Sequence, residues 1–445
     1  MINFIKKNYY YAVFFISLFL LYSFVIYPLL YADPTATYAF SYAIVNGEIP
    51  YLDFNIISTP FYAYVMSLGL LIWNNFSMIL LENSLLVTIM FYLLNKMYQK
   101  KSYILLFVCS LVGFFCINPT YNYMTIFMLV LILFFEKEHH DKDYWIGVLV
   151  GFAILTKHTV GAFFILPSIL YYWKDKKKMG KRLLGVFSVG ILFLFYLWIT
   201  NSFVSFFDLC VLGLFDFSSN NSHPTSIYFY LTILLLIISI IITIKHKEEI
   251  SNYYLLFTFP LTIPLFDLHH FAYYFFCFSI QLLPLIRRYE YELGKLSFRL
   301  FIVCTILFGI VVRNLQPPIL NKDINHYQYV YNGVDNYKVN VKLFRFFDEY
   351  EGALIISYFK MFYDISRDKR IDYFDVPLYG NAGYSGSNKM IAKIKKMHDR
   401  YIIVDRIHYE EENEYSQFDK NIVRYVIENC EKVEERYGFA VYYKK

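Results

Sequence analysis

The chain has 445 residues, of which 58% are hydrophobic and 21% aromatic, and its formal net charge is +5. A water-soluble domain rarely carries so much apolar sequence, so this composition argues against a soluble protein and predicts an integral membrane protein. The six cysteines show neither metal-ligand spacing nor the pattern of a disulfide framework. Nothing in the sequence predicts a nucleic-acid partner.

The basic residues before position 313 predict the topology. Apolar runs are separated by clusters of Lys and Arg, and cytoplasmic loops collect these residues, so we place every cluster in the cytoplasm. The prediction is a polytopic α-helical membrane protein with about eleven transmembrane helices, a cytoplasmic N-terminus and an extracytoplasmic C-terminus. The predicted spans are 9–30, 77–94, 103–117, 123–135, 144–155, 160–172, 183–200, 227–244, 253–266, 271–286 and 300–312.

The first outer loop, residues 31–76, contains the candidate catalytic residue, Asp33. Asp33 directly precedes Pro34, and this pair favours the start of a helix over 34–45, because Asp caps helices and Pro suits their first position. The same carboxylate, at the membrane surface, could act as a general base on a hydroxyl group. The two roles are compatible. The apolar piece 61–73 is interpreted as a short helix in the outer interface.

Three further residues of this loop are candidates for substrate binding. Glu48 lies in a turn and is either a solvated turn residue or a substrate ligand. Tyr51 and Asp53 follow on an extended piece. Asp53 could pair with Asp33 around a divalent metal such as Mg²⁺ or Mn²⁺, or it could stabilise the loop.

Lys157 and His158 form a second candidate site. They join the predicted spans 144–155 and 160–172, which are both shorter than the roughly 20 residues of a full crossing. Charge and irregular backbone are tolerated at membrane depth where they line a wet cavity, so we expect this turn to be recessed. Lys157 could extend its ammonium to the interface, or it could neutralise a lipid-linked phosphate.

The remaining candidates lie at later outer turns. His269 and His270 stand beside Asp267, where they could bind a metal or form hydrogen bonds at the interface. Arg313, at the outer end of the last predicted span, could contact a lipid headgroup or the donor phosphate.

The sequence divides into a transmembrane domain, residues 1–313, and an extracytoplasmic α/β domain, residues 314–445. The second part holds most of the charge and alternates short apolar strands with amphipathic helices. The predicted strands are 353–357, 371–374, 401–405 and 439–443, and the predicted helices are 339–350, 389–396 and 419–429.

The first domain resembles the GT-C superfamily of integral-membrane glycosyltransferases, in the branch of protein O-mannosyltransferases and lipid A aminoarabinose transferase. The matching pieces are an outer loop that opens with Asp33, the run N-G-x-x-P-Y-x-D-F at 46–54, an interfacial helix from Pro60 and the run G-x-x-x-L-T-K-x-T-x-G at 151–161. Protein O-mannosyltransferases carry Asp-Glu where this chain has Asp33-Pro34, so a second acid would have to be Glu48 or Asp53.

The resemblance implies an enzyme of class EC 2.4 that moves a sugar from a polyprenyl-phosphate donor to an acceptor hydroxyl at the outer face of a bacterial plasma membrane. It also implies that Asp33 is the catalytic acid position. The acceptor would be a glycan, a lipid or a protein of the cell envelope. The alternative is a transporter, flippase or polymerase of a lipid-linked saccharide, which would also explain many spans and a charged recess.

Overall fold

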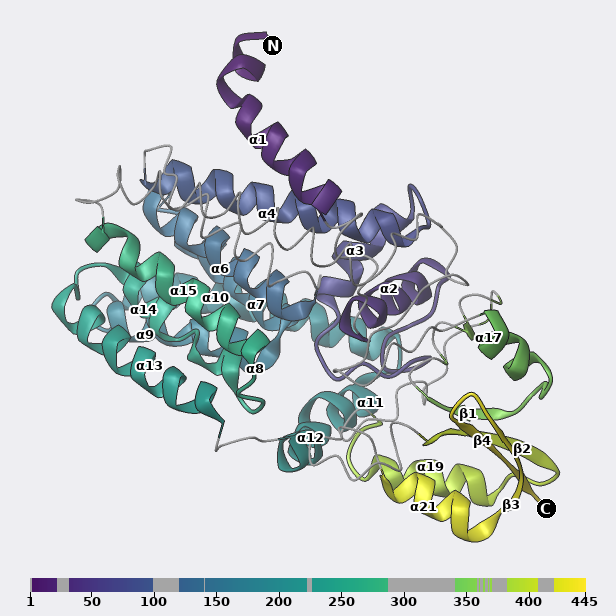
Figure 1. The fold of residues 1–445 in the computed structure, drawn as a ribbon. Coiled ribbons are helices and arrows are strands. Elements are labelled where there is room, and N and C mark those ends of the chain that lie inside the picture. The colour runs from purple at the N-terminus through teal and green to yellow at the C-terminus, as the bar shows by residue number, and fades with distance from the viewer. Residues whose placement is uncertain are drawn as a thin grey trace. The chain divides into compact units, whose positions relative to one another are not determined.

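The computed structural model describes most of the chain, in two compact units (Figure 1). The described residues are 2–21, 32–98, 120–139, 141–221, 226–286, 341–357, 382–406 and 420–445, with single positions between 360 and 369. The first unit contains Met1–Leu29, Thr59–Phe193 and His223–Leu320, and the second contains Leu30–Ser58, Leu194–Ser222 and Asn321–Lys445. The predicted spans 103–117 and 300–312, the predicted strand 371–374 and Arg313 lie outside the described residues.

The first unit is helical. Its helices are α1 (Ile2–Leu21), α3 (Phe61–Leu70), α4 (Phe76–Tyr98), α6 (Tyr121–Glu138), α7 (Asp143–Thr156), α8 (His158–Gly161), α9 (Ile165–Tyr171), most of α10 (Lys176–Ile199), α13 (Ile227–Lys245), α14 (Ile250–Leu256) and α15 (Leu268–Ile286). Among the described residues, three helices are long and apolar enough to cross a membrane, namely α4, α10 and α13. Eleven crossings remain a prediction.

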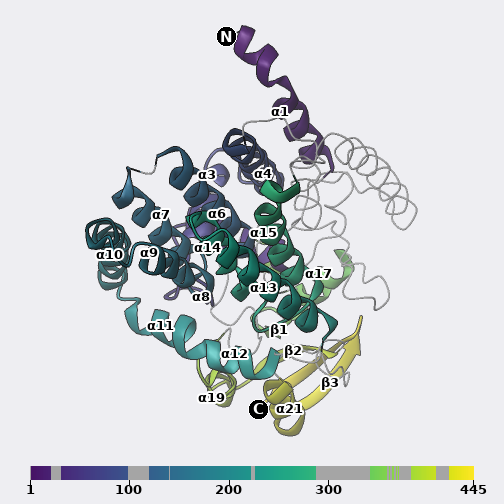
Figure 2. The same cartoon turned by 90° about the vertical axis from the view of Figure 1, so that its left-hand side faces the viewer.

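One predicted span is built differently from a plain transmembrane helix. The predicted span 253–266 is interrupted, because α14 ends at Leu256 and is followed by the 3-10 helix η5 (Phe259–Thr262). Pro260 and Pro264 lie in this stretch and provide no backbone N–H for a continuous helix. Beyond the interruption, α15 lies beside α13 (Figures 1 and 2), and the Ser239 hydroxyl donates to Gln281 Oε1 at 2.7 Å.

A buried ion-pair network joins α6, α7 and α10. The guanidinium of Arg182 is 1% exposed, donates from Nε to Asp143 at 2.9 Å and forms a two-pronged ion pair with Glu136. Buried charges require such partners, since an isolated one is strongly destabilising. Arg182 belongs to the basic clusters that predict cytoplasmic loops, yet here its charge is neutralised by two acids.

Close backbone contact between α7 and α10 accompanies this network. A Cβ on Gly147 would collide with the backbone carbonyl of Arg182, whereas a Cβ on Gly190 of α10 would meet no atom within 4 Å. The small side chain at Gly147 therefore permits the helix spacing that the Arg182 ion pairs use.

We expect Gly147→Ala to lower the thermal unfolding temperature in detergent, since overpacking against a backbone costs about 1–3 kcal/mol. Gly190→Ala is the matched control and should be neutral or stabilising, because Ala is a better helix former than Gly by about 1 kcal/mol. Equal melting temperatures for the two variants would contradict this account of the α7–α10 contact.

The second unit combines a four-stranded sheet with helices. The strand order is β1-β2-β4-β3, with β1 parallel to β2 and the other pairs antiparallel. The strands are β1 (Leu354–Ile356), β2 (Arg400–Asp405), β3 (Glu431–Arg436) and β4 (Phe439–Lys444), and the helices are α2 (Ala32–Val45), α11 (Phe203–Phe207), α12 (Gly213–Asn221), α17 (Val341–Asp348), α19 (Gly386–Lys395) and α21 (Lys420–Asn429).

The sheet is covered on both faces, because its central strands are apolar on both sides. Alternate residues such as Ile402 and Val404 join a core with Met390 of α19 and Val426 of α21. On the other face, Phe439 packs edge-on against Phe347 of α17 at 5.4 Å between ring centroids. Figure 1 shows α19 and α21 together on one side of the sheet and α17 on the other.

The sequence did not indicate β3. Its residues, EKVEER, are mostly charged and show no apolar alternation, so propensity gives no strand signal. Tyr437 and Gly438, both with positive φ, form the two-residue turn that folds β3 back on β4. Pairing with β4, which is apolar, therefore decides this strand.

Residues 201–221, which follow the predicted span 183–200 and were expected in an outer loop, are largely helical. A π-helical turn over Asp208–Leu212 links α11 to α12. Asp208 forms an ion pair with Lys389, and Asp216 accepts a hydrogen bond from the backbone N–H of Ser385 at 2.8 Å. These two carboxylates therefore bind α19 itself and the loop that precedes it.

Candidate functional site

The backbone breaks at Lys157, which separates α7 from α8. Lys157 has an extended conformation, and its carbonyl accepts hydrogen bonds from the N–H groups of Val160 and Gly161 at 3.1 and 2.7 Å. The hydroxyl of Thr59 donates to the carbonyl of Ile154 at 2.9 Å, so a carbonyl left without a helical partner at the end of α7 is also satisfied. The break is thus stabilised by its own backbone hydrogen bonds.

The ammonium group at this break is buried and oriented. Lys157 is 8% exposed, and its Nζ donates to Oδ1 of Asn122 at 2.6 Å. Asn122, in the first turn of α6, is 3% exposed. The sequence alone did not single out Asn122 as a site residue, although it ends the run N-P-T-Y-N, which was expected as the outer turn between the predicted spans 103–117 and 123–135.

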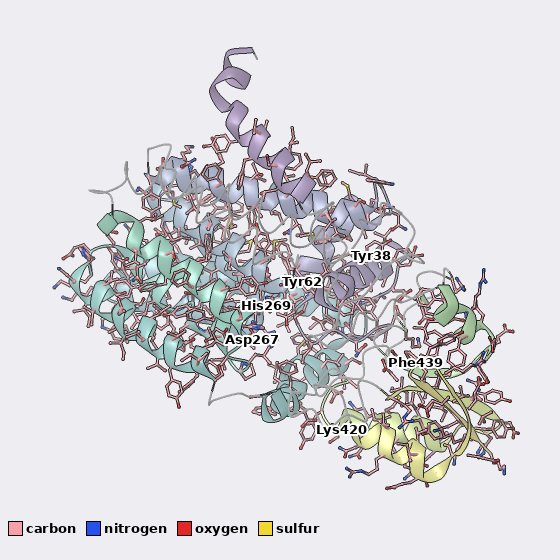
Figure 3. All side chains as sticks on the ribbon, in the orientation of Figure 1. Tyr38, Tyr62, Asp267, His269, Lys420 and Phe439 are labelled. Atoms are coloured by element: carbon pink, nitrogen blue, oxygen red, sulfur yellow. The ribbon has the colours of Figure 1, made fainter. Side chains whose placement is uncertain are left out.

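A second contact of the ammonium is aromatic. Lys157 Nζ lies 5.4 Å from the ring centroid of Tyr121, and this ring packs edge-on against Tyr62 of α3 at 5.6 Å. A cation over an aromatic face gains about 0.5–2 kcal/mol, more when water is excluded. Figure 3 labels Tyr62, together with Asp267 and His269 at the start of α15.

The polar chain continues from Asn122 to α15. Asn122 Nδ2 lies 3.3 Å from His270 Nε2. His270 Nδ1 in turn lies 2.8 and 2.9 Å from the two carboxylate oxygens of Asp267. Asp267 Oδ1 also accepts the backbone N–H of His270 at 2.8 Å, so this carboxylate caps the helix. The four side chains Lys157, Asn122, His270 and Asp267 form what we call the Lys157 relay.

The relay determines the tautomer of His270. An ammonium can only donate, so Asn122 presents its oxygen to Lys157 and its NH₂ to His270. In its neutral form, the His270 ring then accepts at Nε2 and donates from Nδ1 to Asp267.

The carboxylate of Asp267 is adapted to this role. Burial by itself would raise its pKa, but the hydrogen bonds from His270 and the charges of His270 and His269 lower the pKa to about 2. Asp267 is therefore ionised at neutral pH.

The two neighbouring histidine candidates differ from His270 in position. His269 is exposed, and His158 is half-buried beside the break. Among the residues that the structure describes, no group of three or more His, Cys, Asp or Glu side chains is arranged to hold a metal ion. The geometry of His270 is that of a hydrogen-bonding residue.

The candidates of the first loop belong to the second unit. Helix α2 begins at Ala32, so Asp33 lies within its first turn and does not precede the helix as expected. The side chain of Asp33 is outside the described part of the structure. A carboxylate in the first turn is stabilised by the helix dipole.

The turn after α2 is well packed. Glu48 is 4% exposed, so it is not a solvated turn residue as one interpretation of the sequence held. Asp53 accepts the backbone N–H of Ile49 at 2.7 Å, which stabilises the loop. Tyr51 is fully buried, has a φ of 71°, and donates from its hydroxyl to the carbonyl of Ser58 at 3.0 Å. A direct role in substrate binding remains a prediction for these three residues.

Comparisons with known proteins give one structural likeness. No protein-family model matches the chain, and no characterised sequence matches it. The crystal structure of the oligosaccharyltransferase of Archaeoglobus fulgidus, in complex with Zn and sulfate, is similar with a TM-score of 0.45 and 13% sequence identity. The match covers 94% of this chain and 71% of that chain.

We expect Asn122→Leu to destabilise the folded protein by about 2–3 kcal/mol, because the Lys157 ammonium loses a buried acceptor. The measurement is thermal unfolding in detergent, in a double-mutant cycle with Lys157→Met. In the double variant the cost should be substantially recovered, since no buried charge is left to satisfy. Strictly additive effects would show that the Lys157–Asn122 contact contributes nothing.

Proposed function

We propose that the chain is a glycosyltransferase that takes a sugar from a polyprenyl-phosphate donor and transfers it to an acceptor hydroxyl at the outer face of a bacterial plasma membrane. The observation that carries the proposal is the buried ammonium of Lys157, held by Asn122 at a break between two apolar helices. A cation fixed in a poorly hydrated site stabilises a developing phosphate charge far better than one in water.

The composition of the second unit supports the proposed topology. The basic-residue pattern places three segments outside the membrane, namely residues 31–60, residues 201–224 and the C-terminal domain. Parts of all three belong to this one compact unit. Asp208 and Asp216, from the second segment, bind α19 and the loop before it in the third. Segments that share one folded unit must lie on the same side of a membrane.

The proposed chemistry assigns a proton and a leaving group. Asp33 accepts the proton of the acceptor hydroxyl, and the resulting oxygen nucleophile attacks the anomeric carbon of the donor sugar. The bond between that carbon and the phosphate oxygen breaks, its electron pair stays on the phosphate, and polyprenyl phosphate leaves. Lys157 and Arg313 neutralise this leaving group. A divalent cation held by Asp33 and Asp53 would supply further charge neutralisation.

Asp33→Asn should abolish sugar transfer, by at least about a hundredfold, because general-base catalysis contributes about 10²–10⁴ in rate. The assay uses membranes, a radiolabelled polyprenyl-phosphate sugar and no ion gradient. Asp141→Asn, at an exposed acid, is the control and should leave transfer unchanged. Transfer retained in Asp33→Asn would remove Asp33 as the base, and lipid movement without transfer in the unmodified protein would establish a flippase.

Lys157→Met should raise the apparent KM for the lipid-linked donor about tenfold or more, while the acceptor KM stays unchanged, since a charge-assisted hydrogen bond to phosphate is lost. Methionine keeps the volume of the aliphatic stem. Lys177→Met, at an exposed position, serves as the control. An unchanged donor KM in Lys157→Met would count against a role in binding the phosphate.

A further inference from the structure

The second unit contains a pocket of about 250 Å³ away from any residue assigned a role above. It opens where α17 ends and where β1 and β2 begin, with one wall from α19. Ligand pockets for drug-sized molecules occupy about 300–1,000 Å³, so this one suits a ligand of roughly one sugar ring.

The pocket is lined by more positive than negative charge. Four cationic side chains contribute to the lining, Lys360, Lys369, Lys393 and Arg400, against a single carboxylate, Asp364. Among the described lining residues, three positive charges are therefore in excess. The Asp364 carboxylate forms an ion pair with Lys360, and both side chains are largely buried.

Two of the remaining cations, Lys369 and Arg400, are exposed. Neither forms an ion pair with a carboxylate among the described residues, although Lys369 interacts electrostatically with Asp348. Lys369 lies over the ring of Tyr363 at 5.1 Å. Like charges gathered around a concave surface raise the local positive potential and attract anions. The third of these cations is Lys393, a half-buried residue of α19.

Aromatic side chains form the other part of the wall. Tyr350 and Tyr363 line the pocket, and both hydroxyls are engaged by carboxylates outside it, Glu434 and Asp348. The wall that these residues contribute is therefore aromatic, the usual surface against which a small organic ring packs.

We infer that this pocket binds a phosphorylated sugar, with the phosphoryl group at Lys369, Lys393 and Arg400 and the sugar ring against the tyrosines. Phosphate is preferred because it accepts several charge-assisted hydrogen bonds at once, and both Lys and Arg bind it in proteins. The inference does not depend on the proposed transferase reaction, since it concerns binding alone.

The test is isothermal titration calorimetry of the purified full-length protein in neutral detergent with glucose 1-phosphate as the probe. We expect saturable binding of glucose 1-phosphate and no measurable binding of glucose. Lys393→Gln and Arg400→Gln should each weaken the binding by about fivefold or more, as loss of one charge-assisted contact requires.

Lys395→Gln is the matched control, because Lys395 is exposed on the same helix and does not line the pocket. Its affinity should equal that of the unmodified protein. Unchanged affinity in both pocket variants, or an equal loss in Lys395→Gln, would overturn the inference. Inorganic phosphate binding as tightly as glucose 1-phosphate would overturn the sugar part, and equal competition by phosphatidic acid micelles would assign the pocket to a lipid headgroup.

Discussion

The first unit is organised around the need to satisfy one buried ammonium. A charged amine that is moved out of water loses its hydration, and an uncompensated one would shift its proton or unfold the site. Lys157 avoids this cost through Asn122 and the ring of Tyr121. Asn122 lies in the first turn of α6 and also contacts His270 at the start of α15. The end of α7 and the starts of α6 and α15 therefore depend on this one charge. The break between α7 and α8 is part of the same arrangement.

The same logic explains Arg182 at another position in this unit. Its guanidinium is buried, and Glu136 and Asp143 neutralise it from two other helices. The two sites differ in the partners of the buried cation. Arg182 has two carboxylates as partners, which suits a structural role. The ammonium of Lys157 is instead oriented by a neutral amide and an aromatic ring.

Particular residues show how far the sequence could predict the structure. The apolar runs correctly predicted α4, α10 and α13, and the strand patterns predicted β1, β2 and β4, because burial of a whole stretch leaves a periodic signal. Strand β3 and the helices over 203–221 were missed. Their charged or mixed sequences gain structure from a neighbour, β4 in one case and the loop before α19 in the other.

The sequence by itself determined that the chain contains helices long and apolar enough to cross a membrane, since a span needs about 20 predominantly apolar residues. It also identified Lys157, His270 and Asp267 as unusual polar residues among apolar ones. Only the tertiary structure decided that Asn122 links Lys157 to His270 and Asp267, because Asn122 lies 35 positions from Lys157 and 148 positions from His270 along the chain. It likewise decided that Glu48 is buried, since the burial of a turn depends on what packs over it.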